Sequence, residues 1–174
     1  SIAVAARNAT KSASAVKELK SLGVAAEAFE FDATSGSSIK TMVAEVAKRM
    51  QRIDILVNNA GTNIRKPVEE LADDEWHQVI DTNLSSAFKC SKAAYPVMRD
   101  GGGGKILNNG SMLSIFGSPW GSAYAASKGG MVQLTKSMAT AWAKDNIQVN
   151  CFLPGRINTD LTIQARKDVP DLHD

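Results

Sequence analysis

The stretch IDILVNNAG, residues 53–61, decides the fold of this 174-residue chain. Its first five residues form a short and largely apolar run, which is typical of a strand buried inside a parallel sheet. The run ends at two amide side chains and a glycine, which favour a loop. A strand that leads directly into polar residues is expected where a parallel sheet meets its ligand.

The hydrophobic period switches repeatedly between strand and helix on both sides of this stretch. It predicts strands at residues 1–6, 24–31, 53–57, 147–152 and from 105 onward, and helices at 10–22, 37–50, 73–98 and 122–144. Gly23 is a suitable helix end and Asp73 a suitable helix cap. This alternation predicts an α/β fold with a parallel sheet and helices on both faces. We expect a single domain over residues 1–174.

Composition and charge exclude several classes of function. Apolar residues make up 44% of the chain and charged residues 22%, and the net charge is +2 without a basic cluster. The sequence therefore gives no electrostatic basis for binding nucleic acid, and we expect no signal peptide and no membrane-spanning segment. Cys90 and Cys151 fall in a predicted helix and strand, so we expect reduced thiols and a cytoplasmic protein.

In an open parallel sheet the ligand lies beyond the carboxyl ends of the strands. The unusual residues of this chain gather at those predicted ends: Arg7, Asp32, residues 58–61, Ser111 and residues 154–159. The glycine tract at residues 101–104 lies instead between a predicted helix and a predicted strand, and no Lys-Ser/Thr pair follows it. We therefore expect a turn there rather than a phosphate-binding loop.

Tyr124 and Lys128 are four residues apart in a predicted helix, so both side chains lie on one face. A free tyrosine ionises near a pKa of about 10, and a nearby positive charge lowers that pKa. Such a pair suits proton exchange with an alcohol or carbonyl oxygen. The pattern by itself is common on surface helices, and its surroundings decide between the two interpretations.

Those surroundings favour a catalytic site. Ser111 lies where a predicted strand gives way to a loop, and its hydroxyl could hold the same substrate oxygen. Small residues around the pair leave room for a flat ring or a sugar against the helix. Asn83 lies in an otherwise apolar helical stretch and needs hydrogen-bond partners if it is buried.

With these residues the chain resembles the short-chain dehydrogenase/reductase family. The family's Asn-Asn-Ala-Gly motif corresponds to residues 58–61, its helix asparagine to Asn83, its catalytic serine to Ser111 and its Tyr-x-x-x-Lys pair to Tyr124 and Lys128. The resemblance implies a Rossmann-like doubly wound sheet and hydride transfer between a nicotinamide and an alcohol or ketone. It implies that Tyr124 is the general acid/base, that Ser111 holds the substrate oxygen, and that Lys128 lowers the tyrosine pKa and holds the nicotinamide ribose. Asn83 would keep a water that links Lys128 to solvent.

The resemblance also implies a set of cofactor-binding residues. These are Arg7, Asp32, Ala33, Asn59, Ala60, Gly61, Tyr124, Lys128, Pro154, Gly155, Ile157 and Thr159. Arg7 follows the first predicted strand where the adenine ribose would lie, and the preceding Ala5 and Ala6 are not acidic. Because a guanidinium can pair with a 2′-phosphate at two points, we expect NADP in preference to NAD.

Two parts of the family's pattern are missing from the sequence. The opening stretch SIAVAARN resembles the family's second strand, so the first strand and its glycine-rich turn are not found. The family's substrate-covering segment, a further helix and a last strand are also missing after Leu161. We therefore expect an incomplete sheet, the middle portion of a longer chain, with the absent strand between residues 1–6 and 53–57.

Within the family, AGTNIRKPVEEL (60–71) and YAASKGGMVQLTK (124–136) look most like sugar and sugar-acid dehydrogenases, such as gluconate and glucose dehydrogenases. That resemblance favours a role in carbohydrate metabolism and a homo-oligomer, either a dimer or a tetramer. A 3-oxoacyl reductase uses the same catalytic residues and is the nearest alternative. A related epimerase or dehydratase, and a non-catalytic cofactor-binding or scaffold protein, are the other interpretations.

Three cations near the predicted site have no assigned role: Arg65 and Lys66 after the Asn-Asn-Ala-Gly motif, and Arg156 after Pro154 and Gly155. Each could meet an anionic substrate or point into solvent. His77 and His173 are expected at the surface, and nothing near them has metal-ligand spacing, so we expect no metal site.

The missing central strand gives a prediction about stability. Unpaired N–H and C=O groups at buried strand edges cost roughly 1–3 kcal/mol each. Several of them exceed the roughly 5–15 kcal/mol of net stability of a domain. The 174 residues alone are therefore expected to be unfolded or aggregated and not to bind a dinucleotide. A monomer of 18.5 kDa with a cooperative circular-dichroism melt and tight NADPH binding would contradict this expectation.

Overall fold

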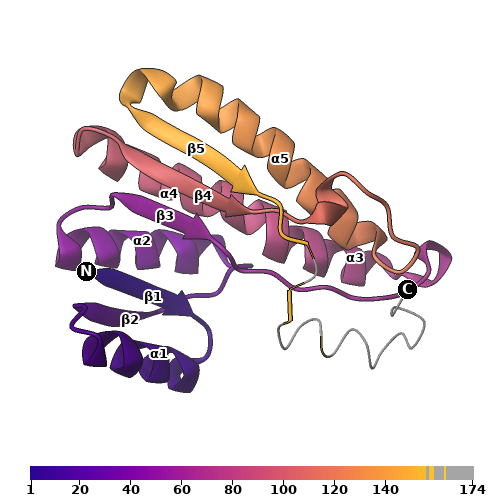
Figure 1. Cartoon of the computed structure of the whole chain (residues 1–174), viewed down its shortest axis with the longest axis horizontal. Helices are drawn as coiled ribbons and strands as arrows, with labels where there is room; N and C mark the ends of the chain where they lie inside the picture. The colour runs from indigo at the N-terminus through magenta and orange to yellow at the C-terminus, as the bar shows by residue number, and fades with distance from the viewer. Residues whose placement is uncertain (156, 159–162, 164–174) are drawn as a thin grey trace.

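The computed structural model describes residues 1–155, 157–158 and 163. The strands are β1 (Ile2–Ala6), β2 (Ala26–Glu30), β3 (Ile55–Asn58), β4 (Gly104–Asn109) and β5 (Ile147–Phe152). The helices are α1 (Ala9–Ser21), α2 (Gly36–Met50), α3 (Asp73–Ile80), α4 (Ser86–Asp100) and α5 (Ser122–Trp142). Strands and helices alternate along the chain, which confirms the predicted α/β class (Figure 1).

All strand pairs are parallel, but within the described residues they form two separate sheets. β1 pairs with β2, and β3, β4 and β5 form the second sheet in that order. β1 and β3 face each other without pairing, at the position where the sequence predicts a missing strand. The expectation of an incomplete, Rossmann-like parallel sheet is therefore confirmed.

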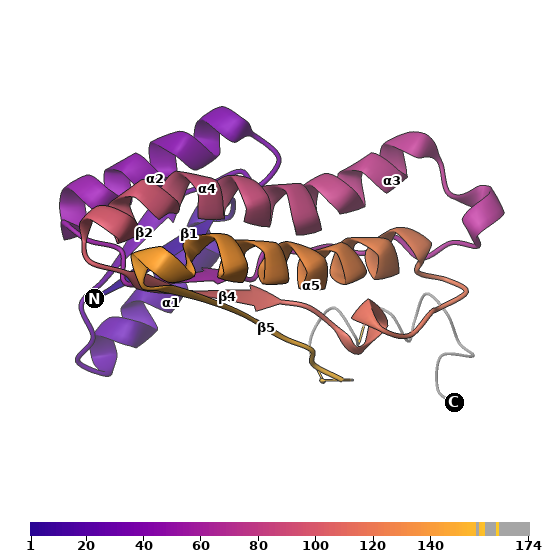
Figure 2. The same ribbon diagram turned by 90° about the horizontal axis from the view of Figure 1, so that it is seen from above.

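Helices lie on both sides of the strands, with α2, α4 and α5 on one side and α1 on the other (Figures 1 and 2). The core lies under the first group and contains Met42, Val46, Met98, Ile106 and Ile147, all buried. The opposite face of the three-stranded sheet is open to solvent, since Ile55, Val57 and Leu107 are exposed. None of the described helices combines the length and apolar character that crossing a lipid bilayer requires.

The long helix predicted at residues 73–98 is not continuous. It consists of α3, a π-helical segment at Asp81–Ser85, and α4. Asp73 is the first residue of α3 rather than its cap, which is Ala72. The Ala72 N–H donates to Glu75 Oε2 at 3.1 Å, so the acidic side chain of the first turn satisfies the backbone donor of the cap residue.

The glycine tract at residues 101–104 is a turn between α4 and β4, as the sequence predicts. Gly102 and Gly103 have φ values of +89° and +127°, which favour glycine. A Cβ atom on Gly103 would also lie 2.4 Å from the Asn146 carbonyl oxygen. The tract leads into β4, whose first residue is Gly104, at the end of that strand opposite to Ser111.

A buried polar network joins the three-stranded sheet to its helices. Asn58 Nδ2 donates to Asn108 Oδ1 at 2.8 Å and to Ser91 Oγ at 3.0 Å, and Asn108 Nδ2 donates to Thr135 Oγ1 at 2.8 Å. The network therefore ties β3 and β4 to α4 and α5. Because a buried amide without partners is costly, this network fixes how α5 lies against the ends of β3 and β4.

Candidate active site

The carboxyl ends of the strands converge at one edge of the molecule (Figure 1). Arg7 follows β1, Asp32 follows β2, Asn59 follows β3, Ser111 follows β4 and Pro154 follows β5. The first half of α5, which carries Tyr124 and Lys128, packs against the short 3-10 helix at Met112–Ser114 that follows Ser111. The fold thus brings the predicted catalytic residues together.

Ser111 is buried at the start of that 3-10 helix and caps it. Its Oγ accepts a hydrogen bond from the Leu113 N–H at 3.2 Å, and the Ser111 N–H donates to Ser114 Oγ at 3.2 Å. The Ser111 side chain also lies close enough to Tyr124 to act, by hydrogen bonding, in the direction that lowers the pKa of the tyrosine. These contacts fix the hydroxyl beside the tyrosine, where both groups can contact one substrate oxygen.

The Tyr124 side chain is half-buried, and this burial raises its pKa above the ordinary value of 10.0. The hydrogen bond from Ser111 and the positive charge of Arg65 act in the opposite direction but do not cancel the effect of burial. The sequence predicts that Lys128 lowers this pKa. In the structure the groups that act to lower the pKa of Tyr124 are Ser111 and Arg65.

Lys128 is only 3% exposed, and its Nζ donates to the backbone carbonyl of Asn109 at 2.5 Å. The Nζ lies 5.5 Å from the centroid of the Tyr124 ring. Burial lowers the pKa of Lys128 from 10.5 to about 8, and the nearby Cys151 opposes this shift slightly. The ammonium is therefore the prevailing form at neutral pH but is held in an unfavourable environment.

Asn83 is fully buried within the π-helical segment. Its side chain accepts from the Thr62 N–H at 2.8 Å and donates to the Thr62 carbonyl and to Ser127 Oγ, both at 3.0 Å. A Cβ atom on Gly61 would lie 3.4 Å from Asn83 Oδ1 and 3.9 Å from Lys128 Nζ. Asn83 thus anchors the loop that passes beside the lysine, and its predicted role in holding a water remains a prediction.

The ends of β1 and β2 hold two predicted cofactor residues of opposite charge. Asp32 Oδ1 accepts from the N–H and the hydroxyl of Thr34, at 2.9 and 2.8 Å. These two hydrogen bonds lower the pKa of Asp32, with a smaller contribution from the charge of Arg7. Ala33 is buried beside them, and Arg7 is exposed at the same end of the cavity between the sheets.

Sequence reasoning missed Asn109, which holds two parts of the site together. Its Nδ2 donates to Asn59 Oδ1 at 2.7 Å, and its backbone carbonyl accepts from Lys128. Its own Oδ1 is buried and has no hydrogen-bond partner among the described residues. The available signal in the sequence was a second asparagine, next to Asn108, at the end of the predicted strand before Ser111. Two further predicted cofactor residues line the cavity between the sheets, Ala60 and Gly61.

The segment after β5 lies beside the start of the 3-10 helix, since the Met112 N–H donates to the Pro154 carbonyl at 2.9 Å. Gly155 and Ile157 are exposed, and nothing within 4 Å would contact a Cβ atom on Gly155. Thr159 and Arg156 lie outside the described residues. The predicted contacts of Pro154, Gly155 and Ile157 with a nicotinamide therefore remain predictions.

Lys66 and Arg65, which follow the Asn-Asn-Ala-Gly motif, differ in their relation to the site. Lys66 Nζ donates to Glu75 Oε1 at 2.6 Å, and this ion pair fixes it to α3 rather than to the site. Arg65 is close enough for its charge to act on Tyr124.

His77 is exposed on α3, and His173 lies outside the described residues. In the part of the chain that the structure describes, no group of histidine, cysteine and acidic residues could hold a metal ion.

The donor set fits a nicotinamide dinucleotide at both of its ends. Arg7 and Asp32 provide charges for an adenosine ribose, and the ammonium of Lys128 provides hydrogen-bond donors for a second ribose. Between them, β1 leads through Arg7 directly to Asn8, whose Oδ1 caps α1 by accepting from the Lys11 N–H at 2.9 Å. A glycine-rich cradle for a pyrophosphate is therefore not found among the described residues.

Comparison with known proteins identifies the family. The family model described as short chain dehydrogenase matches residues 1–170. This match covers nearly the whole chain and includes all the residues assembled at the strand ends. The chain therefore belongs to the short-chain dehydrogenase family.

Individual relatives are identical to this chain at about a third of the aligned positions. A 2-dehydro-3-deoxy-D-gluconate 5-dehydrogenase of Pseudoalteromonas atlantica is 37% identical over 96% of this chain and 66% of its own length. A 3-oxoacyl-(acyl-carrier-protein) reductase of Staphylococcus epidermidis is 35% identical over 92% of this chain and 66% of its own length. The chain thus spans slightly less than two thirds of these curated relatives.

Solved structures agree with the fold. A putative gluconate dehydrogenase from Agrobacterium tumefaciens has a TM-score of 0.92 at 40% identity and covers 98% of this chain and 67% of that one. A gluconate 5-dehydrogenase from Burkholderia cenocepacia, in complex with NADP and tartrate, has a TM-score of 0.91 at 34% identity and covers 97% of this chain and 66% of that one.

The environment of Lys128 gives a testable titration. Its ammonium is expected to lose its proton as pH rises through about 8, because burial disfavours the charged form. In the folded protein, side-chain carbon NMR of labelled lysines should show one resonance with this midpoint, absent from Lys128→Met. If every lysine of the folded protein titrates near the ordinary value of 10.5, Lys128 is not buried as described.

Proposed function

We propose that this chain forms the catalytic part of an NADP-dependent oxidoreductase that interconverts an alcohol and a ketone. The observation that carries the proposal is the convergence of Ser111, Tyr124 and Lys128, with the serine close enough to act on the pKa of the tyrosine. A hydroxyl that can exchange a proton, a second hydroxyl that can hold the same oxygen and a buried cation are the groups that this chemistry needs.

Each side chain of the site has a different role in the proposed reaction at the substrate oxygen. Burial keeps Tyr124 protonated at neutral pH, which is the state that donates a proton to a carbonyl oxygen. Ser111 orients that oxygen by a hydrogen bond, and the charge of Arg65 opposes the effect of burial on the tyrosine. Lys128 would hold the ribose hydroxyls of the cofactor. The nicotinamide, when bound, supplies or accepts the hydride.

The role of Tyr124 predicts a mutational pattern. In the active enzyme Tyr124→Phe should leave cofactor binding nearly unchanged and reduce turnover by at least roughly 10²–10⁴-fold, as is typical of general acid–base groups. Ser111→Ala should have a smaller effect, and Lys128→Ala should weaken both turnover and cofactor binding.

Tyr95→Phe is the matched control, because it removes the only other tyrosine hydroxyl of the chain, which donates to Asp145 Oδ2 at 2.9 Å. It should retain nearly full turnover. Retention of more than about a tenth of the activity by Tyr124→Phe would show that the tyrosine is not the general acid/base.

The proposed preference for NADP rests on Arg7 and is supported by one relative. Arg7 is exposed at the end of β1, close enough to act on Asp32, and a guanidinium can pair with a 2′-phosphate. The Burkholderia gluconate 5-dehydrogenase was solved with NADP. These observations favour NADP as the cofactor of this chain, although the same site could accept NAD.

Arg7→Ala should therefore reduce kcat/KM for NADP by roughly 10–100-fold, since a charge-assisted hydrogen bond contributes about 1.5–3 kcal/mol. It should change kcat/KM for NAD little. Lys11→Ala removes a neighbouring cation on α1 and should affect neither value. A wild-type preference for NAD, or an equal loss with both cofactors in Arg7→Ala, would rule out this assignment.

A sugar acid is the substrate class that the site supports best. Arg65 places a positive charge near Tyr124, where a substrate carboxylate would lie close to the reacting oxygen. Two of the relatives described above are named for gluconate and one for a gluconate derivative. The 3-oxoacyl reductase remains the second candidate because its sequence is nearly as similar. Turnover of sugar acids, neutral sugars and 3-oxoacyl thioesters with NADP or NADPH separates the two.

The remaining parts of the proposal concern the protein as a whole. Residues 1–174 would form one dinucleotide-binding domain, and the protein would act in carbohydrate metabolism as a cytoplasmic homo-oligomer. The proposed reducing compartment rests on the sequence, since the positions of Cys90 and Cys151 do not form a disulfide framework. Light scattering of the purified protein measures the oligomeric state.

A further inference from the structure

The two hydroxyl groups of the site belong to different segments of the chain. Ser111 precedes the 3-10 helix at Met112–Ser114, whereas Tyr124 lies in the first turn of α5. Both groups contact one substrate oxygen in the proposed reaction, so the reaction depends on how the two segments are placed relative to each other. A misplacement of about 1 Å in an active site can cost about 100-fold in rate.

Backbone hydrogen bonds fix the Ser111 segment to the end of β5. The Gly110 N–H donates to the Phe152 carbonyl and the Met112 N–H donates to the Pro154 carbonyl, both at 2.9 Å. These bonds place Ser111 relative to β5, but they do not reach α5. A single 3-10 turn has weak internal hydrogen bonds, so it is not rigid by itself. Another contact must therefore set the segment against α5.

Ser114 makes that contact through one hydroxyl group. Its Oγ donates to the Lys128 carbonyl oxygen at 2.8 Å and accepts from the Ser111 N–H at 3.2 Å. We call these two hydrogen bonds the Ser114 bridge. Lys128 lies about one helical turn after Tyr124, so the bridge reaches α5 next to the tyrosine. Within the described residues it provides the one hydrogen bond from the 3-10 helix to the backbone of α5.

The backbones of the two segments approach each other closely at this level. A Cβ atom on Gly129 would lie 3.6 Å from the Ser114 carbonyl oxygen, which is an ordinary contact distance. A short side chain therefore spans the gap. A hydroxyl both donates and accepts a hydrogen bond, whereas an alanine side chain does neither. The position thus suits serine, or threonine, whose hydroxyl has the same capacity.

We propose that Ser114 is a positioning residue of the reaction, whose bridge between the Ser111 N–H and the Lys128 carbonyl holds the Ser111 hydroxyl in place beside Tyr124. Ser114 acts through Ser111 and does not itself exchange a proton or hold the substrate. Its effect on turnover rests on the function proposed above. Its effect on the placement of Ser111 can be measured without turnover.

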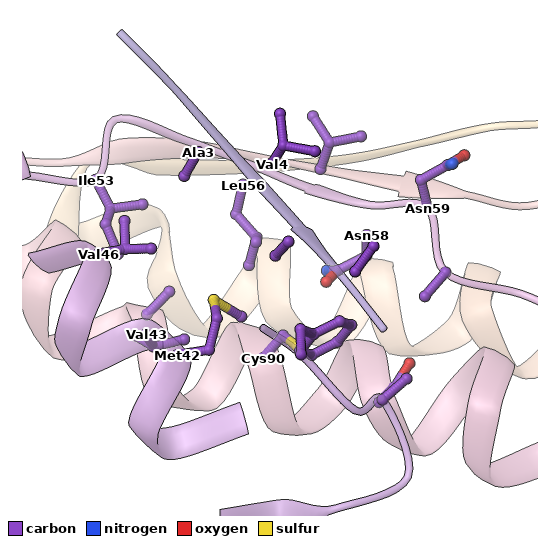
Figure 3. A pocket seen from close by; sticks show the side chains of 18 of the residues that line it. Ala3, Val4, Met42, Val43, Val46, Ile53, Leu56, Asn58, Asn59 and Cys90 are labelled. Carbon is purple, nitrogen blue, oxygen red and sulfur yellow. The ribbon is translucent and has the colours of Figure 1, made fainter. Parts of the chain in front are cut away.

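The Ser114 bridge lies apart from the cavity between the two sheets. That cavity has a volume of about 1220 Å³, and Met42, Val46 and Cys90 are among the residues that line it (Figure 3). The described residues of the lining include neither Ser111 nor Ser114. A substitution at Ser114 therefore tests the bridge and leaves the lining of the cavity unchanged.

Kinetics of the active enzyme give the first test. Ser114→Ala removes both hydrogen bonds of the bridge and should lower kcat by about 10–100-fold. The dissociation constant of NADP should change little, because the Lys128 ammonium keeps its hydrogen bond to Asn109. Ser114→Thr retains the hydroxyl and should restore most of the turnover. Ser21→Ala is the matched control, since it removes a hydroxyl that donates to the Glu18 carbonyl at 2.7 Å on α1, and it should change neither value.

A double-mutant cycle separates positioning from a general loss of stability. If Ser114 acts through Ser111, Ser114→Ala should lower kcat little further once Ser111→Ala is present. A general structural effect would lower kcat by the same factor in both backgrounds. Losses that multiply independently would therefore overturn the proposal, as would an unchanged kcat in Ser114→Ala alone.

Titration of Tyr124 tests the Ser114 bridge without any turnover. Tyr95→Phe leaves Tyr124 as the only tyrosine of the chain, and Ser111 acts to lower the pKa of Tyr124. In this background Ser114→Ala should raise the Tyr124 pKa, as Ser111→Ala does, because the serine hydroxyl is no longer held beside the phenol. The two substitutions together should raise it no further than Ser111→Ala alone. Carbon NMR of labelled tyrosine measures the midpoint.

The remaining charged groups that act on or lie over the Tyr124 ring are Arg65 and Lys128, and all these variants retain both. A Tyr124 pKa in Ser114→Ala equal to that of the unsubstituted background would overturn the proposal. If the wild-type enzyme converts neither sugar acids nor 3-oxoacyl thioesters, the proposed function fails, and the titration still decides whether Ser114 holds Ser111.

A second substitution keeps the test decisive if Ser114→Ala does not fold. Ser114→Cys preserves the shape of the side chain, but its thiol is a weaker donor and acceptor. It should lower kcat and raise the Tyr124 pKa in the same directions by smaller amounts. Wild-type values of both quantities in Ser114→Cys would then overturn the proposal.

Discussion

Hydrogen bonding between parallel strands is the constraint on which the rest of this structure depends. Because β3, β4 and β5 pair in parallel, their carboxyl ends lie side by side, and Asn59, Ser111 and Pro154 meet at one edge. The same requirement makes the gap between β1 and β3 costly, since buried strand edges need partners. The parallel pairing that brings Asn59, Ser111 and Pro154 together is therefore the interaction that β1 and β3 do not make with each other.

The energetics of the site centre on a buried cation. Removing Lys128 from water lowers its pKa to about 8, and one carbonyl oxygen, that of Asn109, accepts a hydrogen bond from its Nζ. A buried ammonium can donate three hydrogen bonds, so the remaining capacity is suited to ribose hydroxyls. The cost of burying the charge is then partly recovered when a ligand binds, which is how a site can favour a polar ligand without a large contact area.

Much of the architecture could be predicted from the sequence, because the hydrophobic period is strong in every strand and helix. The helix at residues 73–98 was predicted as one element, since a π-helical segment inserts a single extra residue and barely disturbs the apolar pattern. The cap at Asp73 was wrong by one residue because the acidic side chain of Glu75 reaches the alanine cap from inside the helix.

Parts of the site could not be predicted, since they depend on distances between segments that are far apart in sequence. Ser111, Tyr124 and Lys128 were found because their residue types and spacing are informative. The effect of Arg65 on Tyr124 and the engagement of Lys66 by Glu75 depend instead on where one loop passes. Asn109 was missed because its role arises from its backbone carbonyl, which every residue has, together with a side chain that reaches Asn59.

The two halves of the proposed cofactor site belong to different sheets. Arg7 and Asp32 lie at the ends of β1 and β2, whereas Tyr124 and Lys128 lie beside the ends of β3 and β4. A dinucleotide that contacts both halves would therefore fix the distance between the two sheets. By linkage, any other interaction that fixes this distance and strengthens cofactor binding by a given factor is itself strengthened by that factor when the cofactor is present.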